Sequence, residues 1–113
     1  MRSAPDTLSI QIPVVNTDVA AGGDAVISIA ANAEQQWVID FIGGGYYAAP
    51  DANTALVVND VTNNTILYQT PVTAAGPIYF PLPPKGLPAP KGSALTITLE
   101  DGSQIKDLCV QYR

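Results

Sequence analysis

The sequence predicts an all-β domain, an eight-stranded jelly roll or β-sandwich, and three observations lead to this fold class. Short apolar segments follow one another along the 113 residues, and none of them has the periodicity of a helix. Residues that favour turns separate the segments, and the chain holds 9 Gly and 10 Pro. Eight segments can be distinguished at spacings of about 8–12 residues, and eight is the number of strands in a jelly roll.

The first, second and fourth segments have the pattern of short strands. Leu8–Ile12 alternates apolar and polar residues, which is typical of a half-buried strand. Ala25–Ala31 is a strand of small residues that follows a Gly-Gly turn. Thr54–Val58 resumes the β-pattern after a loop rich in Pro, Asp and Asn. These segments therefore predict strands at the start and the middle of the chain.

The third segment, Gln36–Ile42, is the strongest core strand that the sequence predicts. Its alternation places Trp37, Ile39 and Phe41 on one face, and we expect that face to be buried. The three glycines at 43–45 follow directly. We interpret them as a bend at the strand end or as an approach to neighbouring backbone.

The second half of the chain supplies four more strands. Ile66–Tyr68 returns from an Asn-Asn turn and forms a hairpin with the preceding strand. Ile78–Phe80 has proline on both sides, so it belongs at a sheet edge or corner, and a proline-rich crossing follows it. Leu95–Leu99 has the cleanest alternation, and an Asp-Gly turn leads from it to the last strand, Ile105–Tyr112.

The charge of the chain limits its partners. Five Lys and Arg against ten Asp and Glu give a net charge of −5, so phosphate groups of nucleic acids and anionic lipid surfaces should repel it. Only 13% of the residues are charged, about half the usual share. Such a surface either lies against another protein or is solvated by neutral polar side chains, and both readings stay open.

The residue types present do not favour catalysis. The chain contains no histidine, which removes the Ser-His-Asp and Cys-His arrangements and most zinc and copper sites. Asp40 alternates with apolar neighbours and is interpreted as an outward side chain, whereas Asp51, Asp60 and Asp101 lie beside turns that aspartate commonly closes. Cys109 lies between two apolar residues and is expected to be a buried, unreactive thiol. We expect no enzyme, no catalytic residue, no metal and no cofactor.

The chain is expected to be one domain, with residues 1–7 as an N-terminal arm and residues 8–113 as the jelly roll. The N-terminus lacks the apolar stretch of a secretory signal, and no apolar run is long enough to cross a membrane. We expect synthesis in a cytoplasm.

Two segments are candidate partner-binding surfaces. One is the arm before the first strand, which a partner could hold in place. The other is the proline-rich loop, whose prolines reduce the entropy lost on docking, although it could equally be a stiff connector. The candidate residues are Ser3, Ala4, Pro5, Asp6, Pro83, Pro84, Lys85, Leu87 and Pro88.

A glycan-binding surface is the alternative function that the residues leave open. Trp37 is in phase with the core residues of its strand, so we expect it to be core rather than a sugar platform. Tyr46 and Tyr47 point to opposite faces of a strand, so one of them should be exposed. That tyrosine could stack against a sugar.

Six segments follow one another in a characteristic order, at residues 22–26, 36–39, 43–47, 59–60, 75–82 and 95–99. This order resembles that of small jelly-roll proteins of tailed bacteriophage virions, particularly the capsid decoration or cement proteins. The resemblance spans residues 8–112 and is one of layout. It implies a structural protein on the capsid surface, a homotrimer at three-fold points of the shell, and the major capsid protein as partner. Similar jelly rolls also serve as tail-fibre tips that bind host glycans.

Overall fold

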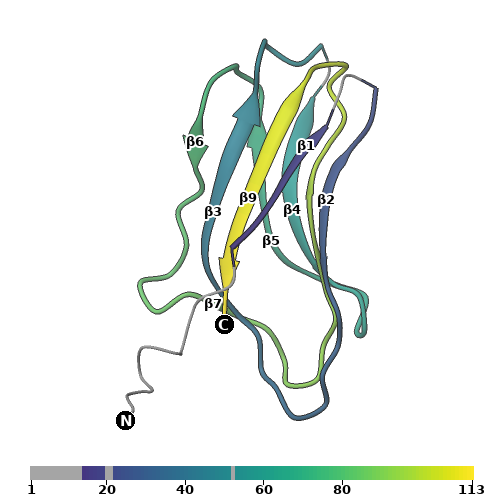
Figure 1. Ribbon diagram of the computed structural model, residues 1–113, viewed down its shortest axis with the longest axis vertical. Helices are drawn as coiled ribbons and strands as arrows, with labels where there is room; N and C mark the ends of the chain where they lie inside the picture. Colours follow the sequence, from purple (N-terminus) through teal and green to yellow (C-terminus); the bar gives the residue numbers. More distant parts are fainter. Residues whose placement is uncertain (1–13, 20–21, 52) are drawn as a thin grey trace, which may run out of the picture.

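The computed structural model describes residues 14–19, 22–51 and 53–113, which form two antiparallel β-sheets (Figure 1). Sheet A has the order β1-β9-β3-β6, and β7 also pairs with β3. Sheet B has the order β2-β8-β4-β5 and lies behind sheet A in Figure 1. The described strands are β1 (Val14–Val19), β2 (Ala25–Ile29), β3 (Val38–Tyr46), β4 (Thr54–Asp60), β5 (Thr65–Val72), β6 (Ile78–Tyr79), β7 (Leu87–Pro88), β8 (Leu95–Leu99) and β9 (Lys106–Tyr112).

The order in which the strands pair is that of a jelly roll. β4 pairs with β5, β3 with β6 and β7, β2 with β8, and β1 with β9, so each pair encloses the one before it. The two-residue strands β6 and β7 both border β3 and together take the position of one strand. The predicted eight-stranded all-β architecture is therefore confirmed.

The core lies between the two sheets and is built by alternation along their strands. In β2 and β8 every second residue is buried, so Ala, Leu and Ile side chains face inward, whereas Val26, Ser28, Thr96 and Thr98 face outward. Each fully buried Leu or Ile contributes roughly 1.5–3 kcal/mol relative to an exposed one. The inward residues with at most 1% exposure include Ile39, Ile42, Tyr46, Leu56, Val58, Leu95, Ile97, Leu99, Leu108 and Val110.

The prediction for β3 is only partly correct. The register to β9 shifts between Ile39 and Phe41, so Ile39 and Ile42 both face the core and Phe41 faces outward. A bulge of this kind reverses the face of every later residue. Trp37 is half-buried, packs against the core, and donates its indole N–H to the carbonyl of Ala30. The predicted core face of Trp37, Ile39 and Phe41 was therefore wrong at Phe41.

The three glycines at 43–45 lie inside β3 and not at its end. Neighbouring backbone approaches two of them so closely that a side chain would not fit. A Cβ at Gly44 would lie 2.2 Å from the carbonyl oxygen of Asp107, and a Cβ at Gly45 would lie 2.1 Å from that of Gly76. Both glycines have φ above +140°, a conformation that other residues avoid. The second interpretation of these glycines, an approach to backbone, is the correct one.

Several strand boundaries differ from the prediction. The predicted strand Leu8–Ile12 and the arm of residues 1–7 lie outside the described residues, and β1 at Val14–Val19 was not anticipated. β5 continues four residues beyond Tyr68, and the proline-rich crossing contains β7. The Asn-Asn turn is present, with Asn64 at a φ of 52°. Among the described residues no helix is long and apolar enough to cross a bilayer.

Candidate functional site

The outer face of sheet B has no charged side chain along its four strands. The register places Val26, Thr98 and Val57 in one row across β2, β8 and β4. A second row consists of neutral polar residues and Ile66. Carboxylates enter only at the rim of this face, from Asp24 and Glu100. We call this surface the neutral face; its outward residues are Val26, Ser28, Val57, Asn59, Ile66, Gln69, Thr96 and Thr98.

The neutral face is hollowed and carries exposed apolar side chains. A hollow of about 430 Å³ lies over β8, β4 and β5. Ile66 is 56% exposed and Val26 is 44% exposed. Another protein can cover such a surface without leaving a charge buried and unpaired, which would cost several kcal/mol. The face therefore suits a protein partner.

One continuous stretch of the sequence also lacks charged residues. No Asp, Glu, Lys or Arg occurs from Val61 to Pro84, a stretch that contains β5 and β6. These strands are the terminal strands of sheets B and A. Edge strands commonly carry charge to prevent pairing with other chains. β5 instead has a bulge near its start and Pro71 near its end, so its exposed edge is interrupted but neutral.

Aromatic side chains gather on the outer face of sheet A. Phe41 and Tyr79 meet edge to face with ring centroids 5.4 Å apart, and Tyr79 is 80% exposed. The Phe41 ring covers Gly43, where a Cβ would lie 2.6 Å from its Cζ atom. Tyr47 is 65% exposed, whereas Tyr46 is buried, so the expectation that one of these tyrosines is exposed is confirmed.

Tyr47 lies at a second hollow on this face. Its hydroxyl donates to Asp107, with both carboxylate oxygens 3.2 Å away. The hollow, about 310 Å³ in volume, is bounded by these two residues, by the backbone at Gly45, and by Gly76 and Pro77 of the loop that precedes β6. The Gly76 N–H donates to the carbonyl of Tyr46 at 2.9 Å and holds this loop against β3.

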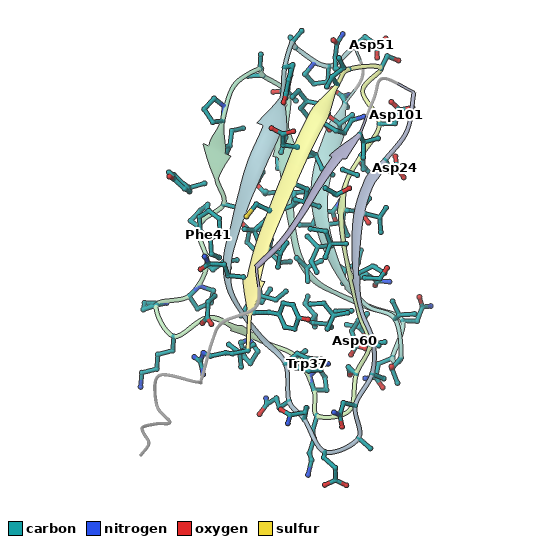
Figure 2. All side chains as sticks on the ribbon, viewed as in Figure 1. Asp24, Trp37, Phe41, Asp51, Asp60 and Asp101 are labelled. Carbon is teal, nitrogen blue, oxygen red and sulfur yellow. The ribbon has the colours of Figure 1, made fainter. Side chains whose placement is uncertain are left out.

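One end of the sandwich is acidic. Figure 2 shows Asp24, Asp51 and Asp101 at that end. The fully buried Lys106 points toward it from β9, donates to the carbonyl of Gly23, and has its ammonium 3.9 Å from a carboxylate oxygen of Asp101. Asp101 also accepts from the backbone N–H of Ser103, as predicted for a turn aspartate. These contacts bind the acidic loops to one another.

Asp60 lies at the opposite end of the sandwich and is fully buried (Figure 2). Its carboxylate accepts from the side-chain amide of Asn63 at 2.7 Å and from the backbone N–H of Asn63 at 3.2 Å. The Asn63 side chain, acting against burial, lowers the pKa of Asp60 below its ordinary value. Asp60 closes the β4–β5 turn, as predicted.

Replacing Asn63 with alanine should change how the stability of the domain depends on pH. Because the folded pKa of Asp60 lies below 3.8, its ionised form favours the folded state above that pH, and this contribution is lost as the pH falls through the folded pKa. The difference in unfolding free energy between wild type and Asn63→Ala should therefore be largest near neutral pH and shrink below about pH 4. Urea unfolding at a series of pH values measures this, with Asn53→Ala on an exposed loop as control. A difference independent of pH would contradict it.

The proline-rich loop is fixed against β3 and the C-terminus. Leu87 and Pro88 form β7, and the Gly86 N–H closes a turn onto the carbonyl of Pro83 at 2.8 Å. The Arg113 guanidinium donates to the carbonyl of Lys85. These contacts fix the proline-rich loop as a connector between strands, and part of its surface faces solvent. Pro83, Pro84, Lys85 and Pro88 are exposed there, and Leu87 is half-buried.

Other predicted features have simpler outcomes. Ser3, Ala4, Pro5 and Asp6 lie outside the described residues. Cys109 pairs with Gly43 and is only half-buried, because Leu108 and Val110 take the core face of β9 and turn Cys109 outward. The expectation of a buried thiol was therefore wrong. Within the described ranges no three His, Cys, Asp or Glu residues gather to hold a metal ion.

Comparison with known proteins yields likeness in fold only. No family model and no curated protein matches the chain. The Drosophila NLP core, whose structure concerns pentamer formation and histone binding, has 16% identity and a TM-score of 0.49 over 88% of this chain and 97% of its own. A Bacillus endospore appendage pilus protein has 16% and 0.42 over 99% and 95%, and a family 16 carbohydrate-binding module has 14% and 0.44 over 85% and 74%. At these values the three structures carry no argument about function.

The neutral face was not predicted, although part of its signal is present in the sequence, and only the exposed tyrosine was predicted for the hollow at Tyr47. The alternation of Leu and Ile with Thr in Leu95–Leu99 already places neutral residues outward, and the absence of charge over residues 61–84 is visible in the sequence. The contact between Tyr47 and Asp107 joins positions 60 residues apart. No local pattern could have indicated it.

Proposed function

We propose that this chain is a non-enzymatic structural protein of a bacteriophage virion, a capsid decoration protein that binds the major capsid protein lattice as a homotrimer. The observation that carries the proposal is the neutral face of sheet B, four strands wide with no outward charge. A surface of this composition resembles the core of protein–protein interfaces, from which charged residues are depleted. The composition of the neutral face therefore supports protein binding better than it supports catalysis.

The charge of the chain favours self-association through this face. Two copies with a net charge of −5 each repel one another wherever their carboxylates approach. Contact through the neutral face keeps like charges out of the centre of the contact and leaves only the carboxylates of Asp24 and Glu100 at its rim. Closed symmetry is the usual outcome when one surface of a soluble protein binds its own copies.

The resemblance to decoration proteins adds the shell as the partner. Its implication is a trimer at three-fold points of a capsid, which ties adjacent capsid subunits together. The exposed residues of the proline-rich loop are candidates for the capsid contact, because the loop is already held in one conformation and loses little entropy on binding. The location that follows is the outer surface of the virion.

The test uses the purified protein and undecorated shells of the major capsid protein. Sedimentation should give a mass of three times 11.8 kDa, and the protein should raise the temperature at which the shells break. The stabilisation should grow with protein concentration, since binding acts only on the assembled state. A monomer at every concentration, together with shells whose stability ignores the protein, would remove the proposal.

A second candidate function is glycan binding by a tail-fibre or adhesin-type module. One observation favours it: the exposed ring of Tyr47 beside a hollow on sheet A. A low copy number on the virion, instead of a fixed ratio to the major capsid protein, would support this candidate over decoration.

A further inference from the structure

We propose that the homotrimer, which this contact presupposes, is built head to tail, with Tyr79 and Lys85 of one copy against the neutral face of the next. A closed ring of three copies repeats one contact between two different surfaces, whereas a surface that binds its own copy gives a dimer. The neutral face therefore needs a second, different surface on the neighbouring copy. The charges at its rim indicate which surface that is.

The rim of the neutral face carries two carboxylates without a basic partner. Asp24 accepts from the backbone N–H of Asp101 at 2.7 Å, and Glu100 accepts from that of Ala55 at 2.8 Å. Among the described residues neither carboxylate forms an ion pair. When another surface covers the face, these carboxylates lose part of their hydration and gain nothing in return unless that surface brings a cation. A neighbour with a basic side chain at the edge of its contact surface is therefore favoured.

Lys85 is the positive charge that a neighbouring copy can bring to this rim. In the described ranges, Lys106 and Arg113 form ion pairs with aspartates, whereas the exposed Lys85 and Lys91 form none. Arg113 also donates to the carbonyl of Lys85, so the backbone that presents this lysine is fixed before docking and loses little entropy. Asp40, the carboxylate that lies against this loop, is neutralised by Arg113 at 3.0 Å.

Lys91 is a poorer candidate, because its loop is joined to an acidic one. The Gly92 N–H donates to the carbonyl of Gln35 at 2.9 Å, and the exposed Glu34 precedes Gln35. A copy that docked through Lys91 would carry the Glu34 carboxylate with it toward the rim. Lys85 has no such neighbour, because Pro83 and Pro84 precede it at the end of the uncharged stretch.

The strand beside the Lys85 loop completes a surface that suits the neutral face. Tyr79 is 80% exposed on β6, the terminal strand of sheet A, and aromatic side chains of this kind are enriched in protein interfaces. Figure 1 shows β6 and the loop after it at one edge of the molecule, whereas the neutral face belongs to sheet B. One copy can therefore use both surfaces at once, as a ring requires. Lys85 is then a contact between copies, and Pro88 remains available to the capsid.

Mixing two variants of the full chain tests the head-to-tail contact. Lys85→Glu reverses the charge beside β6 and leaves the neutral face intact, whereas Thr98→Lys blocks the neutral face and leaves the surface at Lys85 intact. In sedimentation velocity, Lys85→Glu alone should associate at least about tenfold more weakly than wild type, because like charges then meet at the rim. The mixture keeps one intact pair of surfaces. It should give a 1:1 complex with a mass of two times 11.8 kDa that cannot close into a ring.

Lys91→Glu is the matched control, because it makes the same change of charge at the other exposed lysine and should leave the trimer intact. The head-to-tail contact is overturned if Lys85→Glu still forms the trimer, if Lys91→Glu weakens association equally, or if the mixture of variants stays monomeric. In each of these cases the wild-type trimer persists, and the proposed function with it. A wild-type chain that is monomeric at every concentration removes both the trimer and this contact.

Discussion

Replacing Gly45 with alanine should destabilise the folded domain by more than about 3 kcal/mol, the largest loss expected from any single added methyl group. The new Cβ would lie 2.1 Å from the carbonyl oxygen of Gly76. The backbone fixes the positions of both atoms, so no rotation of a side chain can relieve the clash. The φ of 153° adds strain of its own. Either β3 or the loop before β6 must shift, and β3 pairs with β9, β6 and β7.

Gly22→Ala is the matched control for this prediction. Gly22 also has a positive φ, +95°, but nothing lies within 4 Å of a Cβ built there. It should cost only the backbone strain, about 1–2 kcal/mol. Chemical unfolding followed by Trp37 fluorescence compares the two variants. Equal stability of Gly45→Ala and Gly22→Ala would show that the close approach at Gly45 is not a constraint.

The fold class could be predicted from the sequence because alternation and turn chemistry are local. Leu95–Leu99 has the same bounds in the prediction and in the structure, and its apolar residues are the buried ones. The Asn-Asn turn and the prolines around β6 were interpreted correctly for the same reason: the physical cause of each lies in the residues themselves.

The error at Phe41 and the features that were not predicted arose where distant segments decide the structure. The bulge between Ile39 and Phe41 is set by pairing with β9, some 70 residues later, and it turned Phe41 away from the core. The burial of Lys106 depends on Gly23 and Asp101, which β9 meets only in the folded sandwich. Such contacts leave no periodic trace in the sequence.

The sequence allows the prediction that uncharged surface areas exist, but it does not show where they lie on the folded domain. The low charge of the chain indicated neutral areas, but composition cannot say whether neutral residues are scattered or gathered. The jelly-roll order brings β2, β8, β4 and β5 together, and each strand contributes two neutral outward residues. The neutral face therefore forms because the strand order places side by side four strands whose outward residues are neutral.

A charge placed at the centre of the neutral face should abolish self-association and leave the monomer folded. Thr98 lies on β8 between Val26 and Val57, and its side chain points outward. In a Thr98→Lys monomer the ammonium reaches water, so the change in stability should stay within about 0.5 kcal/mol. In the trimer the charge meets an uncharged surface and loses its hydration without gaining a partner.

The expected effect of Thr98→Lys is a loss of association affinity of at least about 100-fold, or about 2.7 kcal/mol. Thr98→Glu should act in the same direction, because a neutral surface compensates neither sign and the added carboxylate also increases the repulsion between chains of net charge −5. Gln111→Lys, an outward position on β9 of sheet A, is the matched control and should leave association unchanged. Sedimentation velocity over a range of concentrations measures all three variants. If Gln111→Lys dissociates the trimer and the Thr98 variants do not, the interface between copies lies on sheet A, and the neutral face remains for the capsid lattice alone.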